Sequence, residues 1–166
     1  QGTEGWDLSL VDPDNRRPVD YDARAAALDG PAAGARLDEL AAGWRDGRVK
    51  QAVIARLLAA RRADPAVFAQ GSYTPLAVDG EAAEHVLGFV RRLDDRALVV
   101  AVPRLTAERL ADAERLAVGW GSTRLRPGLE AGVFTDLLGG ETVPTADGAV
   151  TPSACPPLTV LGWRRA

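Results

Sequence analysis

The chain has 166 residues, with 20 basic and 23 acidic side chains and a net charge of -3, a balance that does not indicate a nucleic-acid-binding surface. Its length allows one domain of ordinary size and excludes a complete eight-stranded α/β barrel, which needs about 250 residues. With a single cysteine the chain cannot form an internal disulfide, and one cysteine with one histidine cannot build a zinc site. The chain contains no apolar run of about 18 residues, so it is not predicted to span a membrane. We therefore expect no cofactor, no metal, and neither nucleic acid nor a membrane as a partner.

The start of the sequence indicates a piece of a longer protein. The chain has no methionine, and Gln1 is not a residue before which an initiator methionine is normally removed. The first residues contain neither the basic nor the apolar segment of a secretory signal. We therefore expect a cytoplasmic location.

Residues 1–22 are predicted to form one long ordered loop. Glycines and prolines, among them Gly2, Gly5, Pro13 and Pro18, interrupt every helical or strand period. Loops of this length without secondary structure of their own are uncommon in compact domains and are usually functional. We therefore expect functional residues in this loop.

Residues 23–64 are predicted to be helical, with a break at Gly30 and Pro31. After the break, apolar side chains recur at helical spacing up to the turn at Asp46 and Gly47; they are Leu37, Leu40, Ala41 and Trp44. A second helix is predicted from Arg48 to Ala63, and Pro65 ends it. Its apolar side chains form two adjacent rows to bury, Val49, Val53 and Leu57 in one and Ile54 and Leu58 in the next.

The sequence from residue 65 onward predicts an antiparallel β-sandwich. Short apolar runs bounded by turn residues cover Tyr73–Val78, His85–Arg91, Ala97–Val102, Gly132–Leu138 and Leu158–Trp163. Between them, Thr106–Ala117 is rich in Ala, Leu, Glu and Arg and is predicted as a short helix. The predicted fold class is thus α+β, with a domain boundary between residues 64 and 65.

The densest group of polar side chains lies between Leu10 and Asp20. Prolines fix the backbone on either side of two carboxylates, an amide and two guanidinium groups, which belong to Asp12, Asp14, Asn15, Arg16 and Arg17. Such a group can bind the vicinal hydroxyls of a sugar or a carboxylate. From its chemistry alone, it can equally be a salt-bridged surface turn.

This stretch resembles the α-amylase superfamily, glycoside hydrolase family 13, and within it the trehalose-forming branch. The resemblance is carried by residues 1–4, by Trp6 and Asp7, and by the run from Leu10 to Tyr21. Further matching segments are DGRVK at 46–50, LLAARR at 57–62, GSYTPL at 71–76, FVR at 89–91 and WGST at 120–123. The resemblance covers nearly the whole chain and is weakest between Gly80 and Ala117.

The resemblance implies an enzyme that isomerises the reducing-end α-1,4 linkage of a maltooligosaccharide to an α,α-1,1 linkage, leaving a maltooligosyl trehalose. It implies a retaining mechanism with two carboxyl groups about 5 to 5.5 Å apart. The catalytic Asp and Glu residues belong upstream of Gln1, so the chain has no catalytic residue and is expected to be inactive alone. Residues 1–64 would be the last βα loop and helices of a TIM-type barrel, and residues 65–166 its C-terminal β-sandwich domain. The expected partners are the upstream remainder of the barrel and the maltooligosaccharide.

The resemblance also places residues 2–21 in the substrate cleft, because βα loops build the active sites of such barrels. In related exo-acting members an Arg in an Asp-Pro-x-x-Arg segment pairs with an Asp elsewhere in the barrel. Arg16 fits that position counted from Asp12, and Arg17 is its neighbour. An alternative is a non-catalytic carbohydrate-binding or structural β domain of another family 13 hydrolase or transferase.

Two further residues are substrate-binding candidates. Trp6 is either a platform on which a sugar ring stacks or a packing residue. Lys50 is the only lysine and is predicted in the first turn of the second helix, where a cation opposes the helix dipole. It is either a binding residue or a solvated helix start.

The remaining conspicuous side chains are predicted to be structural. His85 heads an apolar strand, and Cys155, which precedes two prolines, is expected to be an inert thiol. Trp120 and Trp163 are expected in the core of the β domain, although two tryptophans could also form a starch-binding platform.

Overall fold

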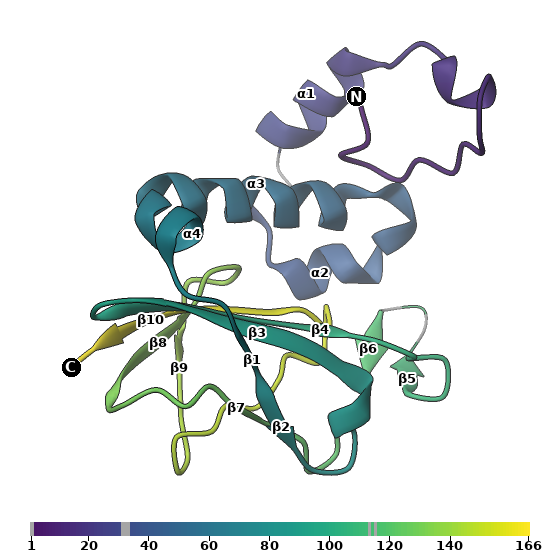
Figure 1. Ribbon diagram of the computed structural model, residues 1–166. Coiled ribbons are helices and arrows are strands. Elements are labelled where there is room, and N and C mark those ends of the chain that lie inside the picture. Colours follow the sequence, from purple (N-terminus) through teal and green to yellow (C-terminus); the bar gives the residue numbers. More distant parts are fainter. Residues whose placement is uncertain (1, 31–33, 113, 115) are drawn as a thin grey trace.

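The computed structural model describes residues 2–30, 34–112, 114 and 116–166, which form helices packed on one face of an antiparallel sheet (Figure 1). Two residues used in the sequence predictions lie outside the described residues. They are Gln1, which indicates a piece of a longer protein, and Pro31, which belongs to the predicted break in the helical region.

The helices and 3₁₀ turns come first along the chain. They are η1 (Asp14–Arg16), α1 (Tyr21–Asp29), α2 (Leu37–Ala42), η3 (Trp44–Asp46), α3 (Arg48–Ala63) and α4 (Pro65–Gln70), followed later by η4 (Ala83–His85). The bounds predicted for α3 are confirmed. α4 was missed, because Pro65 not only ends α3 but also occupies the first position of the next helix, where an amide hydrogen is not needed.

The main sheet has six strands, and each is antiparallel to its neighbours. In spatial order they are β1 (Thr74–Pro75), β3 (Val86–Leu93), β4 (Arg96–Pro103), β10 (Thr159–Arg165), β8 (Gly132–Asp136) and β9 (Thr142–Val143). Two small antiparallel pairs are β2 (Ala77–Asp79) with β7 (Arg124–Arg126) and β5 (Leu110–Asp112) with β6 (Ala117–Val118). The prediction of a mixed fold with an antiparallel sheet is therefore confirmed.

The sheet separates two apolar cores, because successive side chains of a strand point to opposite faces. On β4, Val99 packs with Leu125 of β7 on one face, whereas Leu98 packs with the helices on the other. The helical core contains Leu37, Leu40, Ala41, Val49 and Val67. The layer opposite the helices is thus the β2–β7 pair and its adjoining loops. The boundary between residues 64 and 65 stays a prediction.

One local prediction is wrong. Within Thr106–Ala117, of which Ala113 and Arg115 lie outside the described residues, the chain forms a turn at Thr106 and the β5–β6 hairpin instead of a helix. Cross-strand pairing of Leu110 with Val118 outweighs the local helix propensity there. On α3, Val49, Val53 and Leu57 contact the helical core, whereas Ile54 is half-buried and Leu58 is 52% exposed, so burial of the second apolar row stays a prediction.

Three aromatic side chains take the structural places predicted for them. Trp120 and Trp163 are buried, and the Trp120 indole donates to the Ser153 carbonyl at 2.7 Å. His85 ends η4, and its Nδ1 lies 3.0 Å from the carbonyl oxygen of Leu105.

Cys155 is half-buried, and its lack of reactivity stays a prediction. Among the described residues, the helices are too short or too polar to cross a membrane.

Candidate functional site

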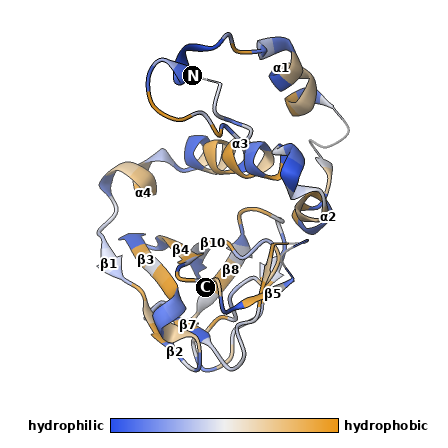
Figure 2. Cartoon of the chain, turned by 90° about the vertical axis from the view of Figure 1, so that its right-hand side faces the viewer, coloured by the Kyte–Doolittle hydropathy of each residue, from blue (hydrophilic) through white to orange (hydrophobic). Residues whose placement is uncertain are grey.

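The N-terminal loop (residues 2–20) and α1 lie on the opposite side of α3 from the sheet, as Figures 1 and 2 show from two directions. α1 begins where the Asp20 carboxylate accepts a hydrogen bond from the amide of Ala23 at 2.9 Å. Neither η1 nor α1 has a buried residue. Most side chains of the N-terminal loop are therefore available to a ligand or a partner.

The polar turn of the loop brings together Asp12 and Arg16. The 3₁₀ turn is closed by hydrogen bonds from the Asp14 amide to the Val11 carbonyl at 3.1 Å and from the Arg16 amide to the Pro13 carbonyl at 3.0 Å. The Arg16 guanidinium then donates to both carboxylate oxygens of Asp12. The Arg16 side chain is 72% exposed, so water screens this pair, and breaking it for a ligand costs little.

Arg17 is directed back into the loop. Its guanidinium donates to the Ser9 hydroxyl at 2.8 Å and to the Asp14 carbonyl at 3.1 Å. The Asp14 carboxylate accepts the amide of Leu10 at 3.1 Å. Arg17 and Asp14 thus hold the shape of the turn that presents Arg16, and Asn15 is exposed on the same turn.

Trp6 and Lys50 form a separate group at the start of α3. The Trp6 indole N–H donates to the carbonyl of Trp44, and the two rings meet edge to face with centroids 6.1 Å apart. Lys50 Nζ donates to the Gly5 carbonyl at 2.9 Å and lies 5.4 Å from the Trp6 ring centroid. The structure therefore uses the Lys50 charge to hold the loop backbone and the Trp6 ring.

Gly47, which sequence reasoning treated only as a turn, allows this contact. Its φ of +81° is left-handed, and a Cβ there would lie 2.9 Å from the Trp6 amide nitrogen and 3.1 Å from Gly5 Cα. In the sequence, the Asp46–Gly47 pair indicates a turn, but such a glycine does not reveal which segment of the chain packs against it. Only glycine lets the loop pack this closely on the start of α3.

Arg24 closes the base of the loop and was also missed, because nothing in the residue pattern distinguishes it from other arginines. It donates to the carbonyl oxygens of Gly2 at 2.8 Å and Asp20 at 2.9 Å, the two ends of the loop. Its guanidinium is 3.6 Å from Glu4 Oε2, a buried oxygen with no hydrogen-bond partner among the described residues. Gln51 of α3 donates to the Arg24 carbonyl at 2.8 Å, which fixes α1 against α3.

Two carboxylates near this group have lowered pKa values. Hydrogen bonds from Ser9 lower the pKa of Asp7. The Arg48 guanidinium, whose Nε donates to the Asp46 carboxylate at 2.8 Å, lowers the pKa of Asp46. The same carboxylate accepts a hydrogen bond from the Arg48 amide at 2.9 Å. Among the described residues, no group of three or more His, Cys, Asp or Glu side chains could hold a metal ion.

Of the seven substrate-binding candidates, the structure places five on one turn and two at the start of α3. Asp12, Asp14, Asn15, Arg16 and Arg17 share the turn, and Trp6 and Lys50 support the other end of the loop. The assignment of these residues to substrate stays a prediction. The arrangement offers two exposed guanidinium–carboxylate pairs, Arg16 with Asp12 and Arg17 with Asp14, on a loop that is fixed at both ends.

No protein-family model matches the chain. Sequences named putative maltooligosyl trehalose synthase from two strains of Mycobacterium tuberculosis are 40% identical to it over 161 residues, which is 97% of this chain and 18% of each relative. The structure of maltooligosyltrehalose synthase from Arthrobacter ramosus matches with a TM-score of 0.71 and 34% identity, covering 98% of this chain and 19% of that one. A mutant of the same enzyme matches with a TM-score of 0.70. The chain thus spans about a fifth of the length of these relatives. Over nearly its whole length, it is similar in sequence and in structure to a C-terminal portion of maltooligosyl trehalose synthase.

Proposed function

We propose that the chain is the C-terminal portion of an intramolecular transglucosylase that converts the reducing-end α-1,4 linkage of maltooligosaccharides into an α,α-1,1 linkage. The observation that carries the proposal is the 40% identity over 97% of the chain to relatives named for trehalose formation. The proposed catalytic carboxylates lie upstream, and this chain contributes the N-terminal loop to the substrate cleft.

In this proposal, residues 1–64 complete a TIM-type barrel and residues 65–166 form the β domain behind it. The exposed apolar side chains of the first region support the idea that more protein covers it. Leu8 is 89% exposed, and Leu10, Val11, Tyr21 and Leu58 are exposed as well. Full burial of one such side chain contributes about 1.5 to 3 kcal/mol, so an upstream barrel that covers several of them has a strong driving force to pack here.

The Asp12–Arg16 pair has the chemistry for the proposed cleft. A sugar hydroxyl accepts from a guanidinium N–H and donates to a carboxylate, so the pair matches two adjacent hydroxyl groups. The same guanidinium can instead turn to an upstream carboxylate and close a pocket around the terminal sugar. Arg17 and Asp14 act in this proposal by keeping the turn in place.

The proposal is tested by expressing the chain together with the upstream sequence of its gene and incubating the enzyme with maltohexaose. We expect reducing ends to disappear without release of glucose. Release of glucose would contradict the proposal and would indicate a hydrolase of the same superfamily. The 166-residue chain alone is expected to convert nothing, because it lacks the nucleophile and the acid of the retaining route.

A further inference from the structure

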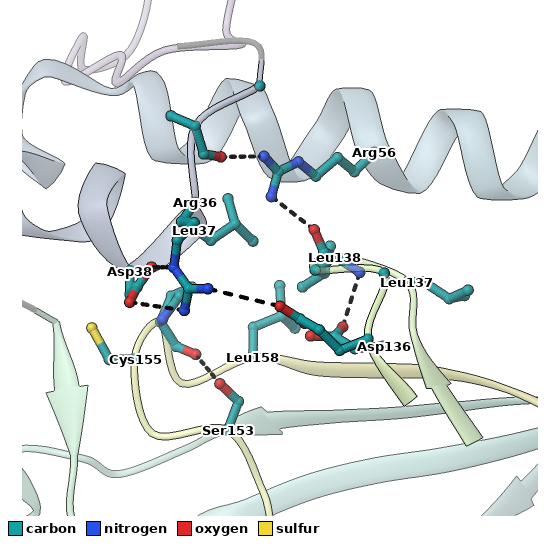
Figure 3. Close-up of a pocket in the computed structure, with 16 residues that line it drawn as sticks. Arg36, Leu37, Asp38, Arg56, Asp136, Leu137, Leu138, Ser153, Cys155 and Leu158 are labelled. Carbon is teal, nitrogen blue, oxygen red and sulfur yellow. Dashed lines mark hydrogen bonds and ion pairs between the residues drawn. The ribbon is translucent and has the colours of Figure 1, made fainter. Parts of the chain in front are cut away.

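A cavity of about 510 Å³ opens between the helical layer and the sheet, on the other side of α3 from the N-terminal loop (Figure 3). Its walls come from four segments that are far apart in the sequence: the turn before α2, the middle of α3, the β8–β9 turn and the loop before β10. Its volume is within the range of sites that hold small ligands.

The walls of this inter-layer cavity are cross-linked by hydrogen bonds. Arg56 of α3 donates to the Leu138 carbonyl at 2.7 Å and also to the Ala35 carbonyl, so it ties two walls to the helix. The Leu138 amide donates to the Asp136 carboxylate at 2.9 Å, and the Asp136 amide donates to the Glu141 carbonyl at 2.8 Å. A cavity whose walls are already held in place loses less conformational entropy when a ligand binds.

The mouth of the cavity carries charges that are not committed to buried partners. Arg36 lies between Asp38 and the β8–β9 turn in Figure 3, with Nε 3.1 Å from Asp38 Oδ1 and Nη1 3.9 Å from Glu141 Oε1. The side chains of Arg36 and Glu141 are 66% and 65% exposed, so their pairing is screened by water and easily rearranged. One guanidinium donor thus lies between two carboxylate acceptors at the opening.

This lining selects a class of ligand. Carboxylates of Asp38, Asp136 and Glu141 outnumber the guanidinium groups of Arg36 and Arg56, which opposes an anion. The described carboxylates form no group able to hold a metal ion. Leu37 and Leu138 are buried and provide an apolar floor. A neutral, hydroxyl-rich ring meets both surfaces, because its hydroxyl groups bond the polar rim and its C–H face contacts the apolar floor.

We propose that the inter-layer cavity is a second saccharide site, which binds a glucose unit of a maltooligosaccharide away from the N-terminal loop. The hydroxyl-rich class of the ligand follows from the cavity, whereas its identity as an α-glucan rests on the proposed function. Arg36 and Glu141 are its principal ligand-binding side chains.

The test is a titration of the ¹⁵N-labelled chain with maltotriose, followed by NMR chemical shifts of the amides. We expect saturable shifts at residues 34–38 and 137–141. Because hydrogen bonds to charged groups are the stronger ones, Arg36→Ala and Glu141→Gln are each expected to weaken binding about tenfold. Arg62→Ala, an exposed arginine of α3 outside the cavity, is the control and is expected to bind as the unaltered chain does.

Four outcomes would overturn the proposal: no saturable shifts, shifts confined to residues 2–20, equal binding by the Arg36→Ala and Arg62→Ala variants, or binding of sulfate at the same amides. Equal binding of cellotriose would overturn the assignment to an α-glucan. The titration needs no catalysis, so it can succeed even if the assembled enzyme proves to be a hydrolase. The failure of one proposal is thereby distinguishable from the failure of the other.

Discussion

The two sides of α3 are stabilised in different ways. Toward the sheet, Val49, Val53 and Leu57 join a continuous apolar core. Away from the sheet, the N-terminal loop is held by hydrogen bonds to carbonyl oxygens, from Lys50 to Gly5 and from Arg24 to Gly2, while Leu8 stays in solvent. Burial of apolar area stabilises the body of the chain, and a few directed polar contacts set the position of the loop. The loop is thus accurately placed but incompletely covered, as expected of a segment that meets a ligand or further protein.

The largest expected effect concerns the exposed turn. In the assembled enzyme, Arg16→Ala is expected to lower transition-state stabilisation by about 2 to 5 kcal/mol, because a carboxylate or sugar hydroxyl in the closed cleft loses its charged partner. Steady-state kinetics with maltohexaose measure the loss, and Arg61→Ala on the exposed face of α3 is the control. Small and equal effects of the two substitutions would remove Arg16 from the site.

The contact between the loop and α3 is tested at Gly47. Gly47→Ala is expected to destabilise the chain by about 3 kcal/mol, from about 1 kcal/mol of left-handed strain and a further clash with the loop backbone. Gly128→Ala is the matched control, because Gly128 also has a positive φ, of +67°, but no described atom lies within 4 Å of its Cβ position. Urea unfolding compares the two variants. Equal destabilisation would mean that the loop does not pack on Gly47.

Leu57 and Leu58 are adjacent on α3, but Leu57 contacts the helical core and Leu58 is exposed, so substitutions of the two compare the covered and uncovered sides of the helix. Leu57→Ala is expected to cost about 2 kcal/mol of unfolding free energy, because Leu57 contacts the helical core. Leu58→Ala is expected to change stability by less than about 0.5 kcal/mol in the isolated chain. If a barrel covers Leu58 in the assembled enzyme, thermal unfolding will show a larger cost for Leu58→Ala there than in the chain alone.

Lys50 is expected to be a positioning residue for the loop. Lys50→Met keeps most of the apolar stem but removes the hydrogen bond to Gly5, so amide exchange at residues 3–7 is expected to rise about tenfold. Hydrogen-exchange mass spectrometry measures this, with Arg62→Met as the control. In the unaltered chain the loop and α1 should exchange faster than β3, β4 and β10. Unchanged exchange in Lys50→Met would show that the ammonium group is not what holds the loop.

The smallest effect is a pH dependence at the start of α3. Arg48 lowers the pKa of Asp46 in the folded chain. The ionised carboxylate therefore contributes to stability at pH values above its ordinary pKa of about 4, and this contribution is lost as the pH falls below that value. The pair is partly solvated, so the contribution is less than about 0.5 kcal/mol. Asp46→Asn should therefore have a smaller loss of stability between neutral and acidic pH, measured by thermal unfolding. A difference between the two proteins that is independent of pH would contradict this.

The elements that sequence reasoning predicted well carry their own periodicity. α3 has apolar side chains at helical spacing between Gly47 and Pro65, and β3, β4 and β10 each contain an apolar run next to a turn. The β5–β6 hairpin has no such signal, because its residues favour a helix locally and its strands form only through pairing across the turn. The same reason explains the exposed Leu58, since residue spacing shows that a row is apolar but not whether anything covers it.

The sequence by itself determined α3, the apolar runs of the main strands, the polar turn around Arg16 and the resemblance that led to the proposed function, because each depends on residues close together along the chain. Only the tertiary structure decided what those residues contact. It directed Lys50 to the Gly5 carbonyl, closed the loop with Arg24, and assembled the inter-layer cavity from four distant segments. Contacts of this kind depend on how the sheet and the helices pack against each other, and residue spacing within a single segment carries no information about that packing.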